Sequence, residues 1–281
     1  MAISASDVKR LREETDAPMM ECKVALEEAG GDFEKAKAIL REKGQSAAAK
    51  RSGRSTSEGV AKFVVSADGK TAVGVVLESE TDFVSNNEGF RKLVDTLANG
   101  LLNAPADAVN GDVNSVSIDG KTVAELVTEG VALFRENIQL TQAVKLESDG
   151  TIGAYNHHNG KFASAAVIGG DASNASELAT EVATQAAISD TVEYLTRAEV
   201  PQDVIASEIE AETKRAINDG KPAEMAAKIA EGRVNKEFFQ NKVLLERPHW
   251  KDESKSTAQF LKEMAQGTAE VTGFKRLTVG G

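Results

Sequence analysis

The spacing of apolar residues changes several times along this chain, and that alternation constrains its fold more than any other feature. Apolar residues recur at helical spacing in residues 4–43 and then alternate as in β-strands over 60–78. Helical spacing returns after residue 90, and a second strand-like segment runs from about 143 to 168. Strand runs followed by helical runs are typical of α+β proteins, so we expect that fold class, with the order of hairpin then helices appearing twice.

Residues 1–44 are expected to form a separate three-helix domain. Asp16 and Pro18 mark the start of the second helix, and Asp32 can cap the third. Gly44 stands where glycine commonly ends a helix in the left-handed conformation. About forty residues suffice for such a bundle.

Residues 45–59 have the composition of a flexible linker. They concentrate Ser, Gly, Lys and Arg and lack a periodic apolar stripe. Four basic residues in and just after this segment, Lys50, Arg51, Arg54 and Lys62, either contact an acidic partner or are simply solvated, and the second interpretation is preferred. We therefore expect a mobile tether between the first domain and the rest of the chain.

The rest of the chain is expected to form a two-part core, with subdomains at 60–142 and 143–281. A turn at 67–69 joins two β-branched runs in the first, and the Asn-Gly pair at 159–160 marks a tight turn in the second. Residues 201–240 predict an antiparallel helical hairpin with a narrow apolar stripe and charged outer faces. Such a hairpin is expected to project from the core as an arm.

Charge and cysteine content exclude several classes of protein. Lys and Arg number 33 against 44 Asp and Glu, a net charge of −11, and such a surface repels a phosphate backbone. Cys22 is the only cysteine, which excludes an intrachain disulfide. No apolar run approaches the roughly 18 residues of a membrane span. We expect a cytoplasmic protein with no direct nucleic-acid or membrane partner.

A search for catalytic or ligand-binding motifs finds none that stands out. The Gly-Lys-Thr tripeptides at 69–71 and 120–122 resemble the end of a phosphate-binding loop, but Val64 and Ser115 stand where that loop needs glycine. His157 and His158 are adjacent in a turn, and neighbouring side chains on a strand point to opposite faces, so they could not easily share a metal without loop geometry. A structural or partner-contacting role is preferred for the pair. We expect no cofactor, no metal and no covalent chemistry, and therefore no enzyme.

One short motif, Thr81-Asp82-Phe83-Val84, lies where the first hairpin ends and a helix begins. In one interpretation Thr81 or Asp82 caps the helix and Phe83 belongs to the core. In the other, Phe83 is an apolar wedge presented to another protein. The pattern alone favours the core interpretation.

Several motifs in a fixed order resemble the elongation factor Ts family, the guanine nucleotide exchange factors of elongation factor Tu. The resemblance spans essentially the whole chain. Its motifs are Leu11-Arg12, Met19-Met20-Glu21-Cys22-Lys23, Thr81-Asp82-Phe83-Val84, Glu136-Asn137-Ile138, Glu231-Gly232-Arg233, Leu244-Leu245-Glu246 and Glu270-Val271-Thr272-Gly273-Phe274.

The resemblance implies a ubiquitin-associated-like fold for the three-helix domain, two α+β core subdomains and the helical hairpin. It also implies partner-binding residues. Arg12, Met19 and Met20 would contact a helix of the G domain of elongation factor Tu, Asp82 and Phe83 its switch and magnesium region, and Phe134 and Arg135 its nucleotide-binding loop.

The chain departs from the family pattern at some of these positions. Pro18 replaces a usual glycine, Phe134-Arg135 replaces the usual Ile-Gly, and Gln185 stands where the family commonly has a histidine that contacts the partner. Gln185 is therefore the eighth candidate partner-binding residue.

The function implied is acceleration of GDP release from elongation factor Tu, by disturbing its magnesium and phosphate site. A homodimer, or a two-plus-two complex with the partner, is compatible with the hairpin. The alternative is a protein-interaction scaffold without exchange activity, which would use the three-helix domain to bind a helix or a ubiquitin-like protein.

Overall fold

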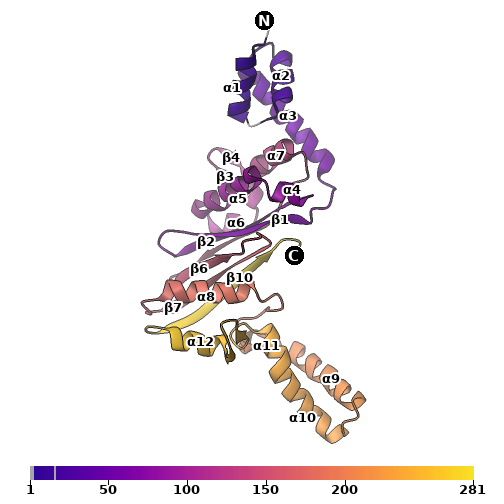
Figure 1. Ribbon diagram of the computed structural model, residues 1–281, viewed down its shortest axis with the longest axis vertical. Helices are drawn as coiled ribbons and strands as arrows, with labels where there is room; N and C mark the ends of the chain where they lie inside the picture. Colours follow the sequence, from indigo (N-terminus) through magenta and orange to yellow (C-terminus); the bar gives the residue numbers. More distant parts are fainter. Residues whose placement is uncertain (1–2, 16) are drawn as a thin grey trace.

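The computed structural model describes residues 3–15 and 17–281 as an elongated molecule (Figure 1). A three-helix domain lies at one end, two stacked sheets covered by helices form the middle, and a helical hairpin lies at the other end. The fold is α+β, as the sequence predicts. Asp16, expected to open the second helix, lies outside the described residues, as do Met1 and Ala2.

The first domain comprises α1 (Ala5–Thr15), α2 (Met19–Glu28) and the start of α3 (Phe33–Arg51). The Asp32 side chain accepts a hydrogen bond from the backbone N–H of Lys35 and so caps α3 as predicted. A small core closes the bundle; its buried residues are Val8, Leu11, Cys22, Ala25, Leu26, Ala36 and Leu40.

Helix α3 does not end at Gly44, and this corrects two predictions. The helix continues to Arg51, so the first seven residues of the expected linker, 45–51, are helical. Gly44 is buried inside the helix, where a Cβ atom would lie 3.4 Å from the Cβ of Ala132. The alanines at 47–49 favour helix, and glycine lets α3 approach a second helix closely, so the linker composition was misleading.

The first sheet is antiparallel in the order β1 (Glu58–Val65), β2 (Thr71–Ser79), β5 (Gln139–Glu147). The expected subdomain boundary after residue 142 falls inside β5, which pairs along its length with β2. The second sheet therefore starts later, with the order β10 (Ala269–Thr278), β7 (Phe162–Gly170), β6 (Thr151–Asn156).

Helices cover the outer face of each sheet, so the core has four layers (Figure 1). The first sheet carries α4 (Asp82–Ser85), α5 (Glu88–Gly100), α6 (Ala106–Asn110) and α7 (Val123–Phe134), the second α8 (Ala175–Ala187) and α12 (Thr257–Met264). Short 3₁₀ helices at Leu101–Asn103, Val113–Ser115 and Arg197–Glu199, and the strands β3 (Ser117–Ile118), β4 (Lys121–Thr122), β8 (Pro248–His249) and β9 (Asp252–Ser256), connect these elements.

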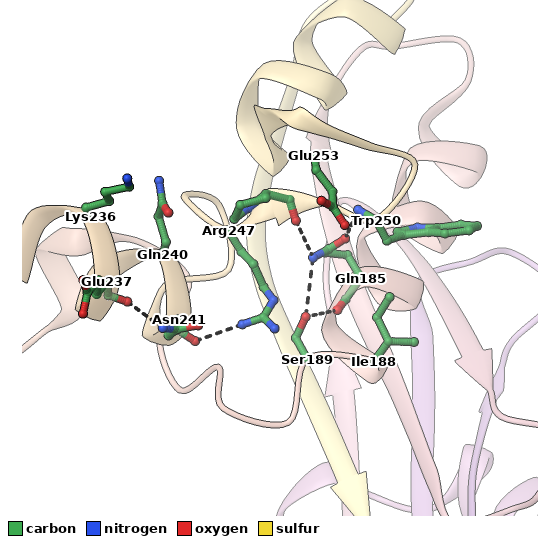
Figure 2. Close-up of a pocket in the computed structure, with 11 residues that line it drawn as sticks. Gln185, Ile188, Ser189, Lys236, Glu237, Gln240, Asn241, Arg247, Trp250 and Glu253 are labelled. Carbon is green, nitrogen blue, oxygen red and sulfur yellow. Dashed lines mark hydrogen bonds between the residues drawn. The ribbon is translucent and has the colours of Figure 1, made fainter.

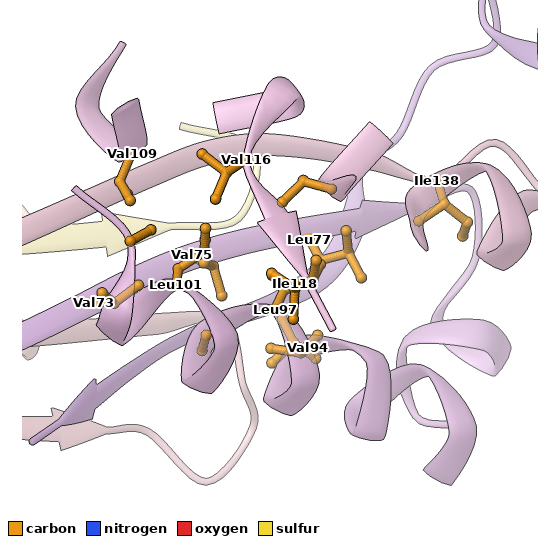
Figure 3. Packing of buried hydrophobic residues seen from close by; sticks show 14 of the residues in the cluster. Val73, Val75, Leu77, Val94, Leu97, Leu101, Val109, Val116, Ile118 and Ile138 are labelled. Carbon is orange, nitrogen blue, oxygen red and sulfur yellow. The ribbon is translucent and has the colours of Figure 1, made fainter. Parts of the chain in front are cut away.

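Strand β2 lies between β1 and β5 in the first sheet, and side chains on both of its faces are buried. Val73, Val75 and Leu77 point into the cluster beneath α5 (Figure 3), whereas Ala72 and Val76 point toward the second sheet. This alternation follows from the two-residue period of a strand. It joins the two expected subdomains through one shared apolar interface.

The hairpin consists of α9 (Gln202–Asn218) and α10 (Ala223–Arg233), and it projects from the core as expected (Figure 1). A π-helical turn (Val234–Phe238) and α11 (Phe239–Lys242) return the chain to the core. A separate apolar cluster at the hairpin base includes Val200, Val234, Phe239 and Val243. Among the described residues, no helix is long and apolar enough to cross a membrane.

Candidate functional site

Phe83 lies on the surface, with 85% of its area exposed, which overturns the core interpretation of this residue. Strand β2 ends at Ser79, and the chain turns directly into the four-residue helix α4, which begins at Asp82. Asp82 is also exposed, whereas Ser85, one turn later, is buried. The short helix thus faces the core at its end and displays Phe83 at its start.

Two carboxylates fix this turn to the segment that follows α7. Glu136 accepts hydrogen bonds from the Thr81 backbone N–H (3.0 Å) and hydroxyl (2.6 Å). Glu80 accepts one from the backbone N–H of Asn137 (2.7 Å) and pairs with Arg54 (3.3 Å). Charge-assisted bonds of this kind are the stronger ones, so Phe83 is displayed from a rigid support.

Phe134 and Arg135, at the end of α7, have different environments from each other. The Phe134 ring is half-buried and packs edge-on against Phe90, with ring centroids 5.9 Å apart. Arg135 is exposed, and it ends α7 in the left-handed conformation with φ 60°. Its guanidinium pairs with Glu21 of α2 at 2.7 Å. The Phe134 ring therefore packs mainly against the core, whereas Arg135 contacts the first domain.

The three candidates in the first domain are all on its surface. Met19 and Met20 open α2 with 52% and 67% of their areas exposed, and Arg12 is exposed in the last turn of α1. Glu21 follows Met20 directly and makes the ion pair with Arg135. The structure thereby brings the start of α2 close to the end of α7, and the end of α7 close to Phe83.

Sequence reasoning missed two exposed apolar residues in the same region. Val24 is 38% exposed one turn after Met20, and Leu133 is 39% exposed beside Phe134. Val24 lies outside the buried apolar face of α2, which Cys22, Ala25 and Leu26 form. The helical spacing in the sequence already places Val24 outside that face.

Gln185 is a buried side chain that lines a pocket, and its assignment as a partner contact stays a prediction. It is 1% exposed, its side-chain oxygen accepts from the Trp250 backbone N–H (3.0 Å), and its amide donates to the Pro248 carbonyl (3.3 Å). Glu181, one turn earlier on α8, accepts from the indole N–H of Trp250 (2.8 Å). Both side chains fix the loop that carries Trp250.

A pocket of about 440 Å³ lies between the end of α8, the hairpin base and this loop (Figure 2). Trp250 and Ile188 line it and stay 47% and 42% exposed. Charged groups surround them, among them Lys236, Glu237, Arg247 and Glu253. The sequence offered one indication of this exposed surface, because the only tryptophan of the chain lies in a polar segment.

The Gly-Lys-Thr tripeptides and the histidine pair occupy turns. Gly69 and Gly120 have positive φ values of 69° and 84°, in the tight connections between β1 and β2 and between β3 and β4. The His157 and His158 rings lie 4.2 Å apart in the turn between β6 and β7, where the sequence places them. Across residues 3–15 and 17–281, no three His, Cys, Asp or Glu side chains cluster as a metal site.

Comparison with known proteins decides the family. The model of the family described as elongation factor TS matches residues 80–281. The chain belongs to the elongation factor Ts family. It is 38% identical to elongation factor Ts of Aquifex aeolicus, with 100% of this chain and 99% of the relative covered. It is 40% identical to elongation factor Ts of Deinococcus deserti, with 97% and 98% covered.

Membership of the elongation factor Ts family gives the chain a role in translation elongation. A third relative, elongation factor Ts of Bifidobacterium animalis subsp. lactis, is 39% identical, with 99% of this chain and 97% of the relative covered. Such lengthwise coverage includes both the first domain and the hairpin.

Proposed function

We propose that this chain accelerates GDP release from elongation factor Tu by binding its G domain in the cytoplasm. The observation that carries the proposal is Phe83, a large apolar side chain 85% exposed on a support that Glu80 and Glu136 hold in place. Exposing such a ring to water is unfavourable, and covering it with a partner relieves that cost.

Exchange requires binding and no bond chemistry. A protein that binds the nucleotide-free partner more tightly than the loaded partner weakens nucleotide binding by the same coupling free energy. A nanomolar nucleotide complex is worth about 12 kcal/mol, so the factor must reorganise strong magnesium and phosphate contacts. In the proposal Phe83 is the inserted wedge, and the Asp82 carboxylate is its polar anchor.

The other candidate residues supply affinity. Met19 and Met20, flexible thioether side chains at the start of α2, suit a hydrophobic helix surface of the G domain, with Arg12 beside them. A second contact uses Trp250 and Ile188, which are exposed at the pocket that the buried Gln185 also lines. Tryptophan at an interface commonly contributes a large share of the binding energy.

Release of a fluorescent GDP analogue from elongation factor Tu tests the proposal. Substoichiometric wild-type chain is expected to accelerate release, and Phe83→Ala to lose most of that acceleration. Trp250→Ala is expected to weaken binding to elongation factor Tu. Its effect on the rate of GDP release is expected to be smaller when the variant is present at saturating concentration. If the chain binds elongation factor Tu without accelerating release, the scaffold alternative is correct and the exchange function is wrong.

A further inference from the structure

Helix α3 connects the first domain to the core without a break. It begins within the bundle at Phe33 and ends at Arg51, so one continuous helix spans the expected boundary (Figure 1). Gly44 packs against Ala132 of α7, and Ala48 packs against the apolar cluster of the first sheet. A helix of this length is a stiff connector, unlike a Gly/Ser-rich coil.

Two ion pairs set the orientation of the domain on α7. Arg41 of α3 pairs with Glu125 in the first turn of α7, and Glu21 of α2 pairs with Arg135 at the opposite end. All four side chains are at least partly exposed, so each pair contributes little to stability. Two pairs at opposite ends of one helix nevertheless define a single orientation.

Arg135 is the residue at which these contacts meet. Its guanidinium binds Glu21, and its carbonyl accepts a hydrogen bond from the Arg51 side chain at 3.0 Å, at the end of α3. Its left-handed backbone is unfavourable for a residue with a Cβ atom, and glycine would adopt it more readily. Glycine would suit the backbone of this turn better, so the feature that favours arginine here is its side-chain contact with Glu21.

We propose that Arg135 is a positioning residue, which together with the α3 strut holds the three-helix domain in one orientation on the core. Met19, Met20 and Phe83 then form a single pre-oriented surface for the partner. This role differs from direct contact between Arg135 and the nucleotide-binding loop. Its consequence for exchange rests on the proposed function, because a pre-oriented surface loses less rotational freedom on binding.

The orientation itself is measured without any partner. Backbone ¹⁵N relaxation of the full chain gives the rotational correlation times of the first domain and the core separately. In the wild type both parts are expected to tumble together. Arg135→Gly and Glu21→Gln are each expected to shorten the correlation time of the first domain, while the thermal midpoint of the core falls little or not at all. Independent tumbling in the wild type, or unchanged tumbling in both variants, would overturn the proposal.

A charge swap separates positioning from partner contact. Glu21→Arg combined with Arg135→Glu re-forms the intramolecular pair and is expected to restore joint tumbling and binding to elongation factor Tu. Each single reversal should weaken binding, by about 10-fold, since the two halves of the surface then bind as loosely linked modules. A swapped chain that tumbles as one body but binds as weakly as the single reversals would assign Arg135 to direct contact instead. Joint tumbling without GDP release would refute the exchange function and leave the positioning role intact.

Discussion

Two phenylalanines seven residues apart have opposite environments in this molecule. Phe83 is 85% exposed at the start of α4, and Phe90 is fully buried in α5. The hydrophobic character of the two residues is identical. Their environments differ because Glu80 and Glu136 fix the turn before α4, so that only the end of α4 faces the core.

Substituting the two phenylalanines separates display from packing. Phe83→Ala is expected to change the free energy of unfolding by less than about 0.5 kcal/mol, as surface substitutions do. The matched control Phe90→Ala is expected to cost about 3–5 kcal/mol, because it empties a buried site. Urea denaturation measures both values. A loss above about 2 kcal/mol for Phe83→Ala would contradict its exposed placement.

His249 is expected to make stability depend on pH. Burial lowers the pKa of its imidazole, against the opposing effect of the Glu181 carboxylate; Lys251 lowers it further and Asp252 raises it. The unfolded chain therefore takes up this proton first, near pH 6.5, and the contribution of the neutral ring, present above that pH, is lost as the pH falls toward the lower folded pKa.

The variant His249→Phe keeps an aromatic ring that can stack on Phe260, where the centroids are now 3.7 Å apart. Its stability is expected to fall less steeply than that of the wild type as the pH is lowered below about 6.5. Denaturant titrations at several pH values measure this slope. Equal slopes for the two proteins would show that His249 is protonated equally in the folded and unfolded states.

At the scale of elements, α3 and the hairpin show two uses of long helices. Helix α3 is held at both ends, by its own bundle and by α7. The hairpin is held only at its base, where Tyr194, Ile205 and Phe239 belong to one cluster. Helix α3 therefore fixes the distance between the first domain and the core, whereas the hairpin extends beyond the core.

Limited proteolysis tests where the connector becomes accessible. Trypsin is expected to cut first after Arg54, which lies past the end of α3, and later after Lys50, which lies within the helix. Backbone in a helix must open locally before a protease can bind it. Mass spectrometry of early fragments identifies the bond. A first cut after Lys50 would place the end of the helix earlier in the chain.

Shortening the hairpin tests its independence. Replacing residues 210–231 with a short Gly-Asn turn retains Ile205, Ile209 and Val234 at the base, and we expect a single cooperative thermal transition close to that of the wild type. The control Phe239→Ala, 5% exposed at the base, is expected to cost about 3–5 kcal/mol. A molten product from the shortened chain would make the tip part of the folding core.

At the scale of the whole molecule, the two sheets share one interface. Gly74 of β2 lies at its centre, where a Cβ atom would be 2.4 Å from the Phe63 ring and 2.6 Å from Leu277 of β10. Leu277 comes from the last strand, more than two hundred residues later in the chain. The halves are therefore expected to unfold together.

Gly74→Ala is expected to destabilise both halves at once, by about 1–3 kcal/mol, since overpacking forces neighbouring side chains and backbone to shift. Trp250 fluorescence reports the second half, and far-UV circular dichroism reports the whole chain. The two urea transitions are expected to coincide in wild type and variant. Separate midpoints would show that the sheets fold as independent domains.

The sequence alone determined the elements whose signals are local. The Asp32 cap of α3, the Asn-Gly turn and the helical hairpin depend on neighbouring residues, so their patterns predicted them. The motifs also placed the chain in its family, and the structure put Met19, Met20 and Phe83 on the surface.

Tertiary structure decided everything that depends on residues far apart in the chain. The alanines after Gly44 favour helix locally, but the close packing of Gly44 on Ala132 depends on the tertiary fold. Strand β5 joins the first sheet because β2 offers an unpaired edge. Gln185 is buried because the Trp250 loop folds over it. Such contacts arise from packing and hydrogen bonding between separate segments, and local spacing carries no record of which segments will meet.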